Sequence, residues 1–168
     1  MPTVLGPFKH GRFIIIALMV LRDIMLFLHI VLASLWVGGM LFLVLVLAPF
    51  VRKLPAKDQV FQEVGRRFSF YGTLIALLGL FITGLFNVHY TLGFSNIFNF
   101  SNPYTLTLWH KIGLFILIVV ISLLHDLYFG KKALERVFHR WMARLLGFVN
   151  LLLSLAVVYF AVLLRFGG

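Results

Sequence analysis

Histidine is the residue of this sequence best suited to bind a metal or to carry protons. The chain of 168 residues contains six histidines and no cysteine. The absence of cysteine excludes disulfides, thiolate metal sites, iron–sulfur clusters and covalent attachment of a c-type haem. Imidazole nitrogen binds both copper and haem iron, and it also takes up protons near neutral pH. Which role each histidine has depends on its place in the elements that hold it.

Those elements are too apolar for an ordinary soluble domain. Hydrophobic residues make up 62% of the chain and charged residues 12%. A membrane-spanning helix needs roughly 20 apolar residues. Four stretches qualify, at about 23–50, 68–92, 104–129 and 143–165. We therefore expect an all-α integral membrane four-helix bundle, a single domain over residues 1–168, surrounded by lipid.

The net charge of +10 implies no role with nucleic acid, because in a membrane protein basic residues collect on cytoplasmic loops.

A shorter apolar run, FIIIALMVL at residues 13–21, precedes the first span. It is too short to cross a bilayer by itself, and Arg22 and Asp23 follow it. We expect it to form an extra interfacial helix within an N-terminal extension, residues 1–22. A signal peptide is disfavoured because the small-residue cleavage pattern is missing and the apolar run resumes after Asp23.

Two of the three connections between spans are strongly basic. The first holds Arg52, Lys53, Lys57, Arg66 and Arg67, and the third holds Lys131, Lys132, Arg136, Arg140 and Arg144. The connection from Thr91 to Tyr104 has no Lys or Arg. Because basic loops stay on the cytoplasmic side, we predict a multi-pass protein of the inner (cytoplasmic) membrane with both termini outward.

Three histidines, each from a different span, fall at one expected depth near the outer face. His29 lies early in the first span, His89 ends the second and His110 begins the third. An ionisable group within the hydrocarbon costs about 2 to 3 kcal/mol on insertion scales and tends to mark a functional interior. The alternative is a hydrogen bond between helices, worth about 0.6 to 2 kcal/mol, or a place among the headgroups. We expect two of the three to be axial ligands of one haem.

His125, on the third span, lies too far from His110 to share a metal with it. The 15 positions between them amount to about 22 Å along a helix. Its neighbour Asp126 favours a proton relay or a salt-linked packing role, because a carboxylate stabilises a protonated imidazole. A second haem site would have to use His139, at the foot of the fourth span. We favour one haem, with the second site from His125 and His139 as the less favoured alternative.

Several residues could surround a cofactor bound at His29. Trp36 and Met40 lie on the same helix face, at i+7 and i+11. Arg22 and Lys111 lie at a similar depth and could pair with haem propionates, although basic side chains also extend to the headgroups without any partner.

The second span has a stripe of small residues that allows two interpretations. Its members are Gly72, Ala76, Gly79 and Thr83. Such a stripe is typical of close helix packing. The alternative is that it leaves space for a flat macrocycle between the helices.

Three of the apolar segments resemble a known superfamily. LHIVLASLWVGGMLF, LFITGLFNVHY and LWHKIGLFILIVVISLLHD resemble the small four-helix membrane proteins of the copper resistance CopD-like superfamily. The third of them, followed by HRWMARLLGFVNLLLSLAVV, is also similar to HemJ-type protoporphyrinogen oxidase. The likeness covers about residues 23–165. CopD-like proteins imply copper uptake, whereas the HemJ likeness implies b-type haem with an important histidine in the first span and lysine in the third. In this sequence those residues are His29 and Lys111, with His110 beside the lysine.

Haem b is the favoured cofactor, and copper is the alternative. Cu(I) prefers thiolate and thioether ligands, but the chain has no cysteine and five methionines, of which Met40 alone lies on the face of His29. We therefore expect a cytochrome b-like protein that passes electrons from a membrane donor such as quinol to an acceptor at the outer face. Three alternatives stay open: a HemJ-like enzyme that oxidises a porphyrinogen, a CopD-like copper-handling protein, and a structural subunit of a respiratory complex. Association with other membrane subunits or with further copies of the chain is also left open.

Overall fold

The computed structural model describes the backbone of residues 8–133 and 135–167, and side chains from residue 13 onward within those ranges. All regular structure in this part of the chain is helical, in agreement with the predicted all-α class. The elements in chain order are α1 (Phe8–Phe42), η1 (Leu43–Leu47), α2 (Ala48–Val51), α3 (Lys57–Arg67), η2 (Phe68–Ile75), α4 (Ala76–Thr91), η3 (Phe94–Asn96), α5 (Pro103–Leu124), η4 (His125–Phe129) and α6 (Val137–Arg165).

The four predicted spans correspond to four continuous helical stretches. These are Phe13–Val51, Lys57–Thr91, Pro103–Phe129 and Val137–Arg165, and each is long and apolar enough to cross a membrane. Asn102 starts the third stretch: its side chain accepts a hydrogen bond from the backbone N–H of Tyr104, and Pro103 occupies the first turn. The four-helix prediction is therefore confirmed.

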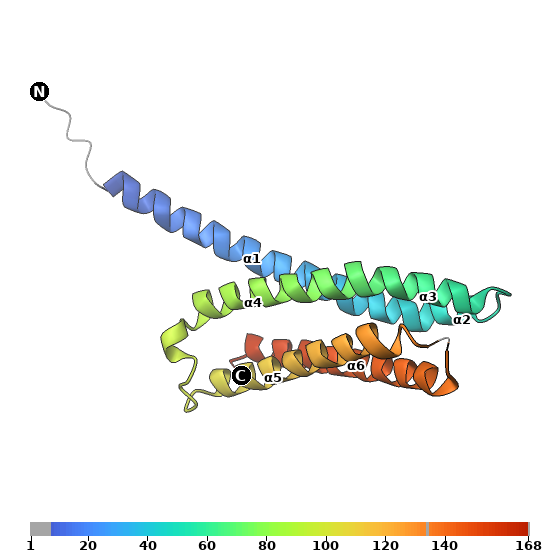
Figure 1. The fold of residues 1–168 in the computed structure, drawn as a ribbon. Helices are drawn as coiled ribbons and strands as arrows, with labels where there is room; N and C mark the ends of the chain where they lie inside the picture. The colour runs from blue at the N-terminus through green and yellow to red at the C-terminus, as the bar shows by residue number, and fades with distance from the viewer. Residues whose placement is uncertain (1–7, 134, 168) are drawn as a thin grey trace, which may run out of the picture.

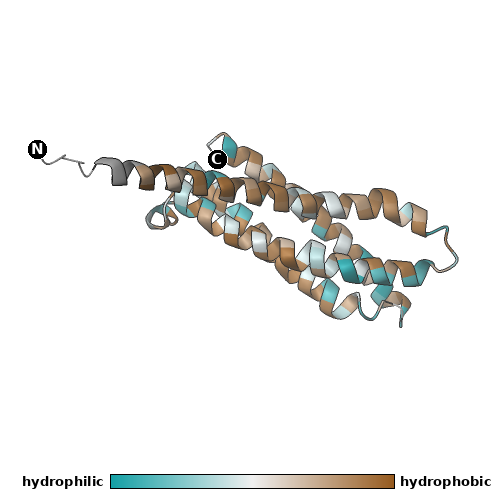
Figure 2. Cartoon of the chain, turned by 90° about the horizontal axis from the view of Figure 1, so that it is seen from above, coloured by the Kyte–Doolittle hydropathy of each residue, from teal (hydrophilic) through white to brown (hydrophobic). Residues whose placement is uncertain are grey.

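The helices pair in two layers. In Figure 1, α1 lies along α4, and α5 lies along α6; the closest helix contacts are within these two pairs. Trp36, Ile118 and Leu151 belong to one buried cluster that joins α1, α5 and α6. Large apolar side chains cover the outside of all four stretches. Figure 2 shows that hydrophobic residues, in brown, predominate along the helices. An exterior of this kind suits a lipid environment.

The N-terminal part of α1 differs from the prediction. We expected a separate interfacial helix that ends at Arg22 and Asp23, but α1 runs without a break from Phe8 to Phe42. The physical reason is that residues 12–37 contain neither glycine nor proline, so nothing interrupts the helix at the charged pair. Arg22 and Asp23 form an exposed ion pair on its surface at 3.0 Å. Residues 1–7 of the predicted extension lie outside the described part of the chain.

Three of the long stretches contain a π-helical segment, η1, η2 and η4. Pro49 follows η1, and its missing N–H removes a bond to the carbonyl of Leu45 inside that segment. In η2, the ring of Phe68 fills the space beside Gly39 and Gly72, where added Cβ atoms would each lie 2.5 Å from it. π-helical turns are rare and occur often at functional sites.

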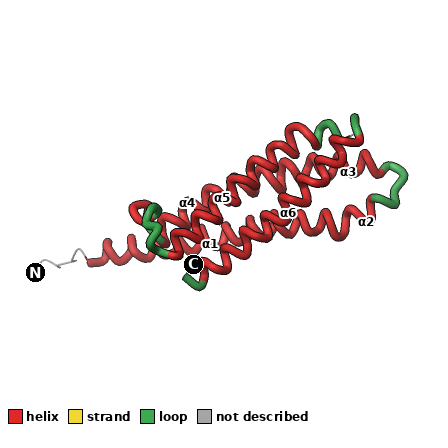
Figure 3. The backbone as a smooth tube through the Cα atoms, turned by 90° about the horizontal axis from the view of Figure 1, so that it is seen from below, coloured by secondary structure: helices red, strands yellow, loops and turns green. Residues whose placement is uncertain are grey.

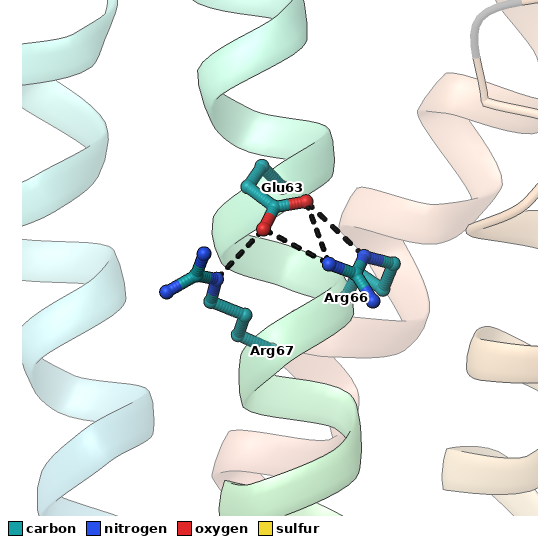
Figure 4. Close-up of polar contacts among 3 residues, drawn as sticks. All are labelled: Glu63, Arg66 and Arg67. Carbon is teal, nitrogen blue, oxygen red and sulfur yellow. Dashed lines mark hydrogen bonds and ion pairs between the residues drawn. The ribbon is translucent and has the colours of Figure 1, made fainter.

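The two basic connections lie at one end of the bundle. Figures 1 and 3 show the α2–α3 loop and the α5–α6 connection at the same end, with the loop after α4 and the C-terminus at the opposite end. At the basic end, the Glu63 side chain on α3 accepts hydrogen bonds from Arg66 and Arg67 (Figure 4), the shortest at 2.7 Å. These pairs are exposed, and exposed ion pairs contribute little to stability. We call this the basic end; the side of a membrane that it faces stays a prediction.

Candidate functional site

His29 is held between α1 and α4 by one hydrogen bond. Its Nδ1 lies 2.8 Å from the Oγ1 of Thr83 on α4. Thr83 is buried, and its hydroxyl also lies 2.7 Å from the backbone carbonyl of Gly79. The imidazole is therefore fixed to the neighbouring helix.

The two contacts of Thr83 determine where the imidazole proton sits. A carbonyl oxygen only accepts, so the single hydroxyl proton of Thr83 is donated to Gly79. The Thr83 oxygen must then accept from His29, which places a proton on Nδ1 and leaves Nε2 with a free lone pair. A histidine whose Nδ1–H is held by a second residue is the arrangement in which imidazole binds a metal through Nε2.

Gly84 lies beside the Cε1 edge of the His29 ring. A Cβ atom added at Gly84 would lie 3.5 Å from Cε1 of His29, so a side chain at this position would contact the imidazole. Elsewhere on α4 the small residues serve packing: a Cβ at Gly79 would lie 2.6 Å from Leu32. The packing interpretation of the small-residue stripe therefore holds at Gly72 and Gly79, where side chains already fill the space.

Lys111 and His110 are neighbours on α5 but point in different directions. Lys111 is half-buried and near enough to His29 for its positive charge to act on the imidazole. Relative to the buried Leu108, Lys111 lies about 60° round the helix, whereas His110 lies about 160° round it. The structure therefore brings Lys111, and not His110, to the side of α5 that is close to His29.

His110 lines a groove on the outer surface of α5. The groove has a volume of about 530 Å³ and is almost wholly apolar; it is lined by Leu106, Trp109, His110, Gly113, Leu114, Leu117 and Phe160. The imidazole stacks on the Phe160 ring, with centroids 5.7 Å apart. Its Nδ1 donates to the carbonyl of Leu106 at 2.8 Å, so its Nε2 is also a free acceptor. That His110 is a haem ligand stays a prediction.

His89 is exposed at the end of α4 and contacts the Phe94 ring, with centroids 5.1 Å apart. It follows Thr83 by six positions, which is about 9 Å along the helix and about 120° round it. His89 therefore lies on a different face of α4 from the residue that holds His29. Among the residues that the structure describes, no three His, Asp or Glu side chains gather as a metal site.

The remaining predicted neighbours of His29 lie at different depths. Trp36 and Met40 are both buried in the core, with exposed fractions of 3% and 7%. They follow His29 by about 10 Å and about 16 Å along α1. Arg22 precedes His29 by about 10 Å along α1 and is already paired with Asp23. Of the predicted cationic partners, Lys111 alone is placed toward His29.

At the basic end, His125 and Asp126 form the pair that the sequence suggested. Nδ1 of His125 lies 2.6 Å from Oδ1 of Asp126, within η4. His139 is nine-tenths buried beside the rings of Tyr128 and Phe129, and its Nδ1 has no hydrogen-bond partner among the residues that the structure describes. A Cβ added at Gly147 would lie 3.9 Å from Nε2 of His125, and His139 precedes Gly147 by about 12 Å along α6. A second haem site from His125 and His139 stays the less favoured prediction.

A polar pair in the middle of the α5–α6 interface was missed from the sequence. The Asn150 side chain donates to Ser122 Oγ at 2.9 Å, and the Ser154 hydroxyl donates to the backbone carbonyl of Asn150 at 2.6 Å. All three side chains are buried. An amide in the middle of an apolar span is costly unless it is paired, and this was the signal in the sequence that could have identified Asn150.

Comparison with known proteins gives one informative match. An "Uncharacterized protein" of Aquifex aeolicus (strain VF5) is 47% identical to this chain over 148 residues, which is 88% of this chain and 97% of the relative. No protein-family profile matches the sequence. No solved structure matches it either.

Proposed function

We propose that this chain, which belongs to the same family as the Aquifex aeolicus protein, is a multi-pass membrane protein that binds haem b through His29. We propose further that it takes part in electron transfer. One observation carries the proposal. His29 is fixed to Thr83 through Nδ1, which leaves Nε2 as a ligand within an apolar bundle.

The residues around His29 suit a haem better than a copper ion. Haem iron needs one or two imidazoles, whereas a protein copper site gathers several ligands around one ion. Met40, the thioether on this helix face, lies about 16 Å from His29 along α1. Haem would supply one-electron oxidation and reduction at this position.

Lys111 would serve the same site through its charge. It lies toward His29 and is half-buried, and it forms no ion pair with any described residue. A buried ammonium group is costly without a counter-ion, and a propionate would provide one. Thr83 would hold the imidazole in its ligand tautomer, and Gly84 would leave the edge of the ring uncovered.

A second function is favoured by one specific observation. The charge of Lys111 is close enough to act on His29, which supports this candidate because these are the two residues to which the HemJ likeness points. Porphyrinogen oxidation is therefore the second candidate. The half-buried lysine would then bind a propionate of the substrate.

The visible spectrum of the purified protein tests the cofactor. We expect a reduced-minus-oxidised α-band of b-type haem that is lost in His29→Ala. His110→Ala is the comparison variant, because its imidazole lines the groove on α5: it keeps the α-band if His29 holds the haem without it, and loses the band with His29→Ala if both are ligands. Loss of haem from His110→Ala but not from His29→Ala would refute the site. Bound copper without haem would refute the cofactor.

Two further assays separate the two candidate functions. Electron transfer predicts that a short-chain quinol reduces the bound haem anaerobically. Porphyrinogen oxidation predicts that the protein produces fluorescent protoporphyrin from protoporphyrinogen, and that Lys111→Met reduces this activity while the α-band persists. A haem protein that does neither would exclude both activities.

A further inference from the structure

The groove on the outer surface of α5 contains one ionisable residue, His110. The groove has a volume of about 530 Å³, and the rest of its lining consists of apolar and aromatic side chains and Gly113. Pockets that bind small molecules have volumes of about 300 to 1,000 Å³, with mostly apolar walls and a few polar groups that orient the ligand. Both the size and the composition of this groove are therefore those of a ligand site.

His110 presents a hydrogen-bond acceptor to this groove. Its Nδ1 lies 2.8 Å from the backbone carbonyl of Leu106, and a carbonyl oxygen only accepts, so Nδ1 carries the proton. Nε2 then has the free lone pair, and no described residue forms a hydrogen bond with it. The side chain is exposed, so a molecule outside the bundle can reach it. A ligand that bonds to Nε2 must donate the hydrogen.

The place of His110 on its helix makes such a ligand favourable. His110 follows Pro103, the first residue of α5, by seven positions, which is about 10 Å along the helix. Ionisable side chains within a span almost always face the bundle interior or a water-filled cavity. His110 is instead exposed on the outside of α5, where an unpaired polar atom is costly. A hydrogen-bond donor on the ligand would remove that cost.

The aromatic rings of the groove favour a flat ligand. The imidazole of His110 and the ring of Phe160 on α6 are nearly parallel, with an angle of 10° between their planes. Trp109 also lines the groove, and its Nε1 donates to the carbonyl of Ile97 at 2.8 Å, which fixes the indole to the loop after α4. Aromatic rings pack on one another in offset or edge-to-face geometry. A second flat ring can therefore pack on these side chains.

The groove also has room for an apolar chain beside that ring. A Cβ added at Gly113 would meet nothing within 4 Å, so this part of the groove is open. From His110 to Leu117 the groove continues for about 10 Å along α5, toward the middle of the helix. Leucine side chains line this part, so it suits a hydrocarbon chain.

We propose that this groove binds a quinol, whose hydroxyl donates to Nε2 of His110 and whose apolar chain lies along Gly113 and Leu117. The corresponding quinone has carbonyl oxygens and no hydroxyl, so it cannot donate to Nε2. The site therefore selects the reduced form. The role of the bound quinol as an electron donor rests on the proposed function, whereas its binding requires no haem. In this arrangement His110 is not an axial ligand.

Tryptophan fluorescence of the full chain in lipid nanodiscs tests the binding. The probe is a decylhydroquinone that carries a bromine atom, kept anaerobic, because bromine quenches indole only in close contact. Trp109 is the tryptophan that lines the groove. Trp36 is buried, and Trp141 lies about 28 Å from Phe160 along α6. We expect saturable quenching by the probe, and we expect Trp109→Phe to abolish it.

The dimethyl ether of the same probe isolates the hydrogen bond. The ether should bind about fivefold more weakly than the quinol, which is the factor that one hydrogen bond typically contributes. His110→Phe keeps an aromatic ring beside Phe160 but removes the acceptor, so in this variant the quinol should bind as weakly as the ether. His89→Phe is the matched control, because His89 is an exposed histidine outside the groove. It should preserve the difference between the two probes.

Equal quenching by the quinol and its ether would overturn the proposal, because the groove would then bind only the apolar chain. Quenching that does not saturate, or a preference for the quinol that persists in His110→Phe, would also overturn it. The haem site is tested separately by its α-band. A protein without haem that still prefers the quinol would refute the proposed function alone, whereas a haem protein without this preference would refute quinol binding alone.

Discussion

Replacing Thr83 by valine tests the assignment of His29 most sharply. Valine has nearly the shape of threonine but cannot accept the proton of His29 Nδ1, which now bonds to Thr83 at 2.8 Å. The variant therefore removes the hydrogen bond between the two helices, together with the bond from the hydroxyl to the Gly79 carbonyl on its own helix, while the packing of α1 on α4 is conserved. Without that acceptor the imidazole is free to rotate and to adopt the other tautomer.

The expected loss differs between cofactor binding and helix packing. Removing the residue that holds a ligand histidine typically weakens binding of its metal ten- to a hundredfold, which is about 1.4 to 2.7 kcal/mol. A hydrogen bond between membrane helices contributes about 0.6 kcal/mol on average and at most about 1.7. We therefore expect haem affinity to fall by more than the stability of the apoprotein.

Haem titration followed by visible absorption measures the haem affinity. Thermal unfolding of the apoprotein in detergent measures its stability. Thr83→Ser keeps the hydroxyl and should restore nearly full affinity. Thr105→Val is the matched control: Thr105 is fully buried, but its hydroxyl has no partner in the described part of the chain, so its loss should not weaken haem binding. The reasoning fails if Thr83→Val binds haem as tightly as the natural chain, or if Thr105→Val loses as much affinity.

Three other predictions concern topology, stoichiometry and packing. A cysteine at Ser95 should react with an impermeant thiol reagent from outside the cell and one at Ala56 should not; the reverse labelling would invert the predicted orientation. Pyridine haemochrome assay should give about one haem per chain, whereas a ratio near two that falls to one in His125→Ala would establish a second haem. Gly79→Val should lower the melting temperature by separating α4 from α1, because even a Cβ there would lie 2.6 Å from Leu32; an unchanged melting temperature would show that this contact yields easily.

The number of helices and their approximate limits could be predicted because hydrophobicity and length determine which segments cross a bilayer. The start of the first helix could not. The run at residues 13–21 is too short to span, but nothing between it and His29 breaks a helix, so the structure continues α1 through Arg22 and Asp23. The length of an apolar run determines whether it can span a membrane, whereas Gly and Pro residues determine where a helix begins or ends. For residues 13–21 these two criteria give different limits for the first helix.

The histidine trio shows a second limit of the sequence. His29, His89 and His110 share an expected depth, but depth says nothing about direction. His110 and Lys111 differ by about 100° round α5, and the residue nearer the buried side of the helix, whose charge acts on His29, is the lysine. The partners that fix a tautomer, such as Thr83 for His29, depend on contacts 54 positions apart in the chain, which no local pattern reveals.

The π-helical segments have a consequence for comparing this chain with its relatives. A π turn closes i→i+5 bonds and so contains one residue more than an α turn, while the helix beyond it keeps its direction. Deleting one residue within Leu43–Leu47, Phe68–Ile75 or His125–Phe129 would return that turn to α geometry without turning the flanking faces away from their neighbours. We therefore expect single-residue gaps in alignments of this family to fall in these three segments. A gap elsewhere in α1 or α4, between His29 and Trp36 for example, would rotate the rest of the helix by about 100° and separate residues that must share a face.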